Sequence, residues 1–230
     1  SLQLTAITLR VPDLARSVDF YMRQLGFVTS PAATGHRPGR ADLAVAPGAP
    51  TILTLVEDRA APAPARHTSG LFHAALLLPD RGALGAWLRF AAENGVEFDG
   101  FSDHAVSEAI YLTDPHGNGL EFYADRPRDA WPFAANGEVM MTTRPLAVPA
   151  LLAAAPAASA APLAGAHWGH LHLRVTDLDR SEAFYHDALG LAVTQRSYPG
   201  ARFMAADGYH HHVAVNTWNR DQAPQPPDSL

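Results

Sequence analysis

The chain has 230 residues and a formal net charge of -6, with acidic and basic residues mixed along its length. This distribution lacks the basic patch that neutralises nucleic-acid phosphates, so we expect no nucleic-acid partner. The sequence has no cysteine, which excludes disulfides, thiolate zinc sites and cysteine nucleophiles, and any metal must be held by His, Asp or Glu. The first residues lack the charged start and long apolar run of a signal peptide, so we expect a cytoplasmic protein.

The first predicted elements are a strand ending at Val11 and a helix with Asp13 as its N-cap and Gly26 as its stop. The same pattern returns late in the chain. The stretches "LRVPDLARSVDFYMRQLGF" (9–27) and "LRVTDLDRSEAFYHDALGL" (173–191) are identical at 11 of 19 positions. In the second stretch the cap and stop are Asp177 and Gly190. Such self-similarity predicts a duplicated unit.

A weaker copy of this unit lies between the two. It predicts a strand, a Pro-Asp break, a helix ending near Asn94 and a strand beginning at Val96. Residues 109–125 then predict a hairpin around a turn at 114–119. Each unit therefore contains a strand, a helix and about three further strands. We place the three units at 4–58, 70–125 and 168–219.

Residues 145–166 form an uncharged segment that contains four prolines and many alanines. This composition makes a poor membrane span, and we expect no membrane partner. The segment predicts a linker with a short helical piece around "PALLAAA". The last 12 residues are Pro-rich and too short for another unit.

The repeat resembles the vicinal oxygen chelate superfamily, which includes glyoxalase I, the bleomycin and fosfomycin resistance proteins and the type I extradiol dioxygenases. "LRVPDLARSVDFYMRQLG", "DPHGNGLEFYADRP" and "GHLHLRVTDLDRSEAFYHDALG" carry the resemblance. Within it, "SDHAVSEAIYLTDPHGNGLEFYADRP" and "GYHHHVAVNTW" look most like bacterial catechol 2,3-dioxygenase-like proteins. The resemblance implies an α+β fold in which paired βαβββ units form half-open barrels, each with one divalent metal on its concave face.

With that fold, we expect residues 1–130 to form a first glyoxalase-like domain from units one and two. Residues 131–166 would be an Ala/Pro-rich linker, and residues 167–230 the first half of a second domain. Three units are visible and a fourth is apparently missing. The third unit is too small to stand alone, so we expect it to dock on a unit beyond Leu230 or on another chain in a homo-oligomer.

The resemblance implies metal ligands from a His on the first strand of a unit and a Glu on the last. These positions hold His170 in the third unit and His73 with Glu121 in the second, but Ala6 in the first. Two imidazoles and a carboxylate leave room for a catechol and O₂, which suits Fe(II) or Mn(II). The first domain would then have an incomplete site or none. The alternatives are a core histidine at His73 and a solvent-facing strand residue at Glu121.

Three consecutive histidines, His210, His211 and His212, precede an apolar segment near the end of the chain. The resemblance implies an acid/base histidine here, a task that a near-neutral pKa suits. Strand alternation selects His210 or His212 for the concave face, whereas superposing the motif selects His211. A solvated strand end is the alternative. Weaker candidates for substrate contacts are His172, Asn216 and His104.

These residues favour a metal-dependent extradiol dioxygenase that cleaves a catechol-type aromatic diol with O₂. One alternative is a glyoxalase-type isomerase or lyase, which would use a metal to stabilise an enediolate and a carboxylate as base. The other is a metal-free small-molecule binding or resistance protein, which Ala6 favours for the first barrel. The expected partners are a small aromatic substrate and O₂.

Overall fold

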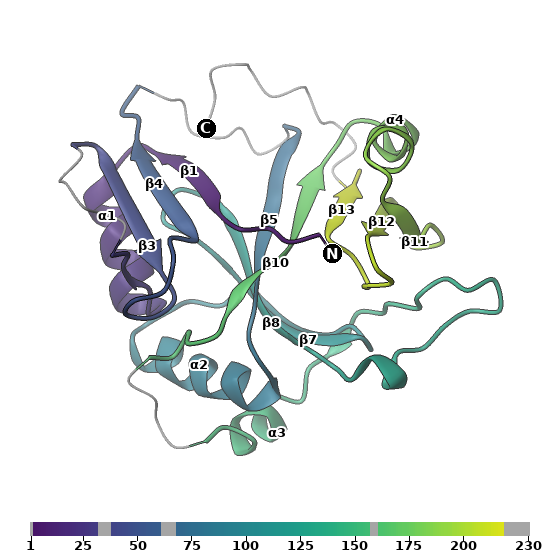
Figure 1. The fold of residues 1–230 in the computed structure, drawn as a ribbon. Coiled ribbons are helices and arrows are strands. Elements are labelled where there is room, and N and C mark those ends of the chain that lie inside the picture. Colours follow the sequence, from purple (N-terminus) through teal and green to yellow (C-terminus); the bar gives the residue numbers. More distant parts are fainter. Residues whose placement is uncertain (1, 32–37, 61–67, 157–160, 219–230) are drawn as a thin grey trace.

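The computed structural model describes residues 2–31, 38–60, 68–156 and 161–218, and it has an α+β fold with two sheets (Figure 1). One sheet has four strands in the order β1-β4-β3-β2. The other has nine strands in the order β11-β12-β13-β10-β5-β8-β7-β6-β9 and curls into a half-barrel. The predicted fold class of repeated strand-helix-strand units in a half-open barrel is confirmed.

The three units have the same order of elements. The first contains β1 (Ile7–Val11), α1 (Leu14–Asp19), η1 (Phe20–Gln24), β2 (Val28–Thr29), β3 (Arg40–Ala44) and β4 (Leu53–Glu57). The second contains β5 (Gly70–Leu77), α2 (Arg81–Glu93), β6 (Gly100–Asp103), β7 (Ser107–Thr113) and β8 (Gly119–Asp125). The third contains β10 (His167–Arg174), α4 (Leu178–Glu182), η3 (Ala183–Ala188), β11 (Ala192–Gln195), β12 (Ala201–Ala205) and β13 (Val213–Asn216).

The helix of each unit begins with the same cap. The side chains of Asp13, Asp80 and Asp177 accept hydrogen bonds from backbone N–H groups of the first turn at 2.9, 2.8 and 2.9 Å. In the first and third units the chain then turns at Gly26 and Gly190, whose φ angles are +90° and +77°. Such left-handed backbone favours glycine, and the predicted caps and stops are therefore confirmed.

The pairing of the units differs from our expectation. Strands of the second and third units share the nine-stranded sheet, because β5 and β10 pair antiparallel at its centre (Figure 1). The first unit forms the separate four-stranded sheet, so the expectation that units one and two close one barrel is wrong. The third unit docks within this chain, on the second unit. The division into domains at 1–130, 131–166 and 167–230 stays a prediction.

The first unit packs against the second through side chains instead of through strand pairing. One hydrophobic core contains Tyr21 and Leu25 of the first unit together with Trp87 and Phe122 of the second. Within the second unit, the rings of Trp87 and Phe122 stack with centroids 3.7 Å apart. The indole N–H of Trp87 donates to the Leu25 carbonyl of the first unit at 3.1 Å. Burial of such large aromatic groups dominates core energetics, so the shared core holds the two units together.

The segment between the second and third units is packed onto the fold. It contains η2 (Arg128–Ala130), β9 (Arg144–Pro145), which pairs with β6, and α3 (Val148–Ala153), which matches the predicted helical piece. Leu151 of α3 is fully buried in the main core. Across the described parts of the chain, no helix has the length and apolar character needed to traverse a bilayer.

Candidate metal centre and substrate cavity

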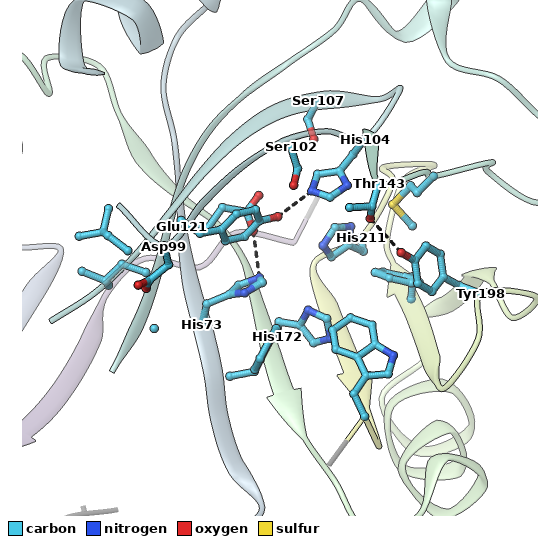
Figure 2. A pocket seen from close by; sticks show the side chains of 18 of the residues that line it. His73, Asp99, Ser102, His104, Ser107, Glu121, Thr143, His172, Tyr198 and His211 are labelled. Atoms are coloured by element: carbon cyan, nitrogen blue, oxygen red, sulfur yellow. Dashed lines mark hydrogen bonds and ion pairs between the residues drawn. The ribbon is translucent and has the colours of Figure 1, made fainter. Parts of the chain in front are cut away.

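Three predicted ligands meet on one face of the half-barrel. They are His73 on β5, Glu121 on β8 and His170 on β10, and their ligand atoms lie within 4.8 Å of one another. Glu121 Oε2 is 2.9 Å from His73 Nε2 and 3.2 Å from His170 Nε2 (Figure 2 shows the first contact). All three side chains are buried. His170 thus occupies the position that we expected to remain open because of Ala6.

Strand register explains why these three residues converge. Ala75 lies in the middle strand, with His170 as its partner on β10 and Glu121 as its partner on β8. His73 is two residues before Ala75, and alternate residues of a strand share a face. The side chains from three neighbouring strands therefore point to the same side of the sheet.

The two units that form the half-barrel are not equivalent in their ligands. His172 is the counterpart of Ala75, because the antiparallel pair matches His172 with His73 and His170 with Ala75. The partner of His172 on the last strand of its unit is Ala214, which therefore stands where Glu121 stands in the second unit. The small apolar side chain of Ala214 supplies no ligand there, so the described residues bring two imidazoles and one carboxylate to the cluster.

The donor set fits a divalent cation. His73 Nε2 is buried and makes no hydrogen bond of acceptable geometry with any described residue, and His170 Nδ1 is also without a partner there. Burial lowers the pKa of His170 to about 4. Burial by itself would raise the pKa of Glu121, but the two imidazoles outweigh it and hold that pKa well below its usual value. A neutral imidazole and an ionised carboxylate are the forms that bind metals.

A cavity of about 430 Å³ opens onto this cluster (Figure 2). Its wall combines aromatic rings with polar groups that include the carboxylates of Asp99 and Glu121, and no Arg or Lys of the described chain lines it. That lining suits a flat, uncharged aromatic molecule held by a few directional polar contacts. The aromatic and imidazole side chains of the wall include Phe72, His104, Tyr111, His172, His211 and Trp218.

Tyr111 is a site residue that our sequence analysis missed. Its hydroxyl lies 2.6 Å from His104 Nε2, while His104 Nδ1 lies 2.5 Å from the Thr142 carbonyl. The carbonyl can only accept, so Nδ1 carries the proton and the Tyr111 hydroxyl donates to Nε2. Burial, and then the charge of Glu121, raises the pKa of Tyr111 well above its usual value. Tyr111 is the cross-strand partner of Glu121 in the predicted hairpin. Pairing the residues of the two strands outward from the turn would have identified Tyr111 from the sequence.

The three consecutive histidines lie before the strand, which begins at Val213. Strand alternation therefore does not apply to them, and its selection of His210 and His212 for the cavity is wrong. His211 lines the cavity, with its ring centroid 4.0 Å from that of His170. His210 is fully buried, and His212 is half-buried with its Nδ1 accepting from a backbone N–H.

The remaining weak candidates also lie near the cavity. His172 lines it, and the side-chain amide of Asn216 donates to His172 Nε2 at 3.0 Å. Burial lowers the pKa of His172 well below its ordinary value, so His172 is neutral and has its proton on Nδ1. Asn216 acts on the cavity through His172.

Comparison with known proteins agrees with this fold. The family model for the Glyoxalase/Bleomycin resistance protein/Dioxygenase superfamily matches residues 3–122 and 167–227, so the chain belongs to that superfamily. Over 223 residues it is 40% identical to catechol-2,3-dioxygenase of Bacillus subtilis (strain 168), covering 95% of this chain and 76% of the relative. Over 121 residues it is 33% identical to a trivalent organoarsenical cleaving enzyme of Thermomonospora curvata, covering 51% of this chain and 74% of that enzyme.

Solved structures show the same fold at low sequence identity. A Bacillus subtilis protein described as a candidate dioxygenase superposes with a TM-score of 0.61 at 15% identity, covering 94% of this chain. This chain spans 64% of the length of that structure. Glyoxalase I from Zea mays superposes with a TM-score of 0.56 at 16% identity, covering 94% of this chain and 68% of the enzyme. At these identities, the likeness concerns the fold alone.

Proposed function

We propose that this chain is an extradiol dioxygenase-like oxidoreductase that cleaves a catechol-type aromatic diol with O₂. The observation that carries the proposal is the cluster of His73, Glu121 and His170, whose ligand atoms lie within 4.8 Å of one another at the wall of an aromatic cavity. The name of its 40% identical relative, catechol-2,3-dioxygenase, supports the same reaction class. In this proposal the three residues hold Fe(II) or Mn(II).

When bound, the metal would supply the Lewis-acid and redox chemistry that lets a diol react with O₂. The protein's own part begins with binding. The rings of Phe72 and Trp218 pack edge to face, with centroids 5.5 Å apart, and form an aromatic wall of the cavity. An aromatic substrate that stacks on this wall is oriented and displaces water from the cluster, which strengthens the electrostatic contacts inside.

Two groups of the cavity are suited to move or hold protons. His211 is assigned as the acid/base group that takes a proton from a diol hydroxyl, because it lines the cavity beside His170. Tyr111 donates its hydroxyl proton to His104 Nε2, so its hydroxyl oxygen is assigned to accept a hydrogen bond from a substrate hydroxyl. His172 is assigned to form part of the cavity wall, and Asn216 is assigned to hold the His172 ring through its hydrogen bond.

The proposal is tested by metal analysis and oxygen uptake. Protein purified without chelators should contain about one Fe or Mn per chain, and oxygen consumption should depend on added catechol. His170→Asn should lower metal affinity and kcat/KM by about 100-fold or more, because a ligand is removed. His167→Asn changes an exposed histidine of the same strand and should leave both unchanged.

Two results would contradict the proposal. A protein that consumes no oxygen with any catechol, although it is metal-loaded, would favour a glyoxalase-type isomerase or lyase. A protein that stays metal-free under these conditions would favour a small-molecule binding protein. The choice between Fe(II) and Mn(II) follows from reconstituting the metal-free protein with each. We also propose a cytoplasmic location and a homo-oligomeric state, which cell fractionation and light scattering test.

A further inference from the structure

A series of hydrogen bonds runs from His211 in the cavity wall through His210 to Asp125. His211 Nδ1 lies 2.7 Å from His210 Nδ1, and His210 Nε2 lies 2.9 Å from Asp125 Oδ1. His210 is fully buried, whereas a quarter of the Asp125 side chain is exposed (26%). Asp125 is the last residue of β8, the strand that carries Glu121. These hydrogen bonds therefore connect His211, the proposed acid/base group, to a carboxylate outside the cavity.

We propose that Asp125 and His210 are positioning residues that set which nitrogen of His211 carries its proton. In this arrangement His211 is protonated on Nδ1 and presents the lone pair of Nε2 to the cavity. The inference rests on the proposed function, since it assigns the partners of the base that the ring cleavage needs. It gives a role to His210 that does not require it to reach the substrate.

The hydrogen bonds of His210 fix where the ring protons of His210 and His211 lie. A carboxylate only accepts hydrogen bonds, so the contact with Asp125 requires a proton on His210 Nε2. A neutral imidazole has one N–H, which leaves His210 Nδ1 as an acceptor. The contact of 2.7 Å between the two Nδ1 atoms needs one proton, and His211 must provide it. With His210 neutral, Nε2 of His211 then has no proton and can accept one.

The packing around His210 holds this geometry. The rings of Tyr209 and Trp131 lie with centroids 4.0 and 5.2 Å from that of His210. The hydroxyl of Tyr209 also donates to Asp125 Oδ1 at 3.2 Å, and the hydroxyls of Tyr209 and Tyr123 lie 2.8 Å apart. His210 is therefore fixed by neighbours on several sides, and Asp125 is oriented by a second donor.

The step assigned to this pair is a single proton transfer. The O–H bond of a bound diol breaks, its proton bonds to His211 Nε2, and the electron pair stays on the substrate oxygen. His211 becomes an imidazolium whose Nδ1–H points at His210, and the carboxylate of Asp125 stabilises the positive charge through that neighbour. The aspartate of a Ser-His-Asp triad performs the same two tasks, since it holds the tautomer of its histidine and stabilises the imidazolium. The proton returns to an oxygen of the product in the reverse direction.

The main test replaces Asp125 by Asn, which keeps the size of the side chain but adds an N–H donor. An amide that donates to His210 Nε2 moves the His210 proton to Nδ1, and His211 Nδ1 must then accept. We expect Asp125→Asn to lower kcat by about 100-fold with almost unchanged KM, as for loss of a general base. Asp129→Asn, an exposed aspartate four residues later, is the matched control and should keep the wild-type kcat.

A second readout does not depend on activity. Imidazole ¹⁵N shifts of the metal-free protein report the tautomer of each histidine, with the His211 signals assigned from their loss in His211→Asn. We expect His211 to carry its proton on Nδ1 in the wild type and in Asp129→Asn, and on Nε2 in Asp125→Asn. A purely structural role of Asp125 would change stability but would not move the proton.

The two readouts separate the ways in which the inference can fail. A wild-type spectrum with the His211 proton on Nε2 overturns the inference, even if Asp125→Asn does not fold. An Asp125→Asn protein with wild-type kcat and an unchanged His211 tautomer overturns it as well. Absence of catechol-dependent oxygen uptake in every form overturns the proposed function, while the ¹⁵N spectra still decide whether Asp125 and His210 set the tautomer.

Discussion

Glu182 at the end of α4 is held by two arginines, one directly after β11 and one on β12. It pairs with Arg196, and its Oε2 lies 3.1 Å from Nε of both Arg196 and Arg202. Hydrogen bonds from Arg196, with the charges of both arginines, lower the pKa of Glu182 below its usual value of 4.5. Because the folded-state pKa is the lower one, the unfolded chain takes up this proton first as the pH falls.

This linkage gives a pH-dependent prediction. Glu182→Gln should be less stable than the wild type at pH 7, and the difference should shrink as the pH falls below about 4.5, where the stabilisation by the carboxylate is lost. Urea unfolding at pH 7 and pH 4 measures it. Glu97→Gln removes an exposed carboxylate without a described ion pair and should show no such difference. A constant difference at both pH values would mean that the ion pairs do not contribute.

Single residues also show where sequence patterns were sufficient and where they were not. His73, Glu121 and His170 were found because each keeps its position relative to a repeated motif. His211 was obscured because alternation presumes a regular strand, and the backbone there is irregular up to Val213. Tyr111 was missed because a tyrosine in an apolar strand gives no signal of its own until its partner across the hairpin is considered.

At the scale of elements, β10 depends on a glycine beside the candidate ligand His170. The register between β10 and β5 shifts between Trp168 and His170, so Gly169 lies at a bulge. A Cβ added at Gly169 would be 1.8 Å from the hydroxyl oxygen of Tyr123. That distance is far below any van der Waals contact, so either β10 or the Tyr123 ring must move.

We therefore expect Gly169→Ala to lower the free energy of unfolding by about 1–3 kcal/mol and to weaken metal binding, because β10 carries His170. Urea unfolding and a Co(II) titration followed by absorbance measure the two effects. Gly100→Ala is the matched control, since a Cβ there meets no atom within 4 Å. Equal free energies of unfolding and equal Co(II) affinities of the two variants would show that β10 accommodates a Cβ at Gly169 without loss of stability.

The local elements followed closely from the sequence. Asp before an apolar-periodic stretch and Gly after it marked the helices, because capping and left-handed backbone are properties of single residues. The short helix of residues 148–153 was also expected. Its packing was not, because an Ala-rich composition does not specify what a segment contacts, and Leu151 inserts into the core of the second unit.

At the scale of the whole molecule, the sequence defined the units but not their partners. Leu9 and Leu173 begin similar motifs, so the first strands of the units offer similar edges and similar apolar faces. The repeat does not specify which two edges pair, because contacts such as that of Trp168 on β10 with Ile52 join residues distant in sequence. Chain order suggested that the first two units would pair, and the β5–β10 pair shows the opposite choice.

This pairing predicts the behaviour of a fragment. Residues 1–130 contain His73 and Glu121 but lack β10, so the fragment should bind Co(II) at least about 100-fold more weakly than the whole chain. Its β5 edge would lose its partner strand, so we also expect self-association in size-exclusion chromatography. The full-length His170→Asn variant is the control that loses the ligand but keeps the sheet. A fragment that binds Co(II) like the whole chain would show that His170 is not a ligand.

No described residue of the first unit belongs to the candidate cluster, yet this unit contacts the strand that carries His170. The indole N–H of Trp168 donates to the Ile52 carbonyl of the first unit at 2.6 Å, and Leu4 forms an isolated bridge with Trp168. Trp168 is two residues from His170, so the first unit helps to fix the strand that carries this candidate ligand. The first unit is therefore needed although it has Ala6 in place of a histidine. Substitutions in its hydrophobic core should change metal affinity at the candidate site, although the described residues of the unit supply no ligand there.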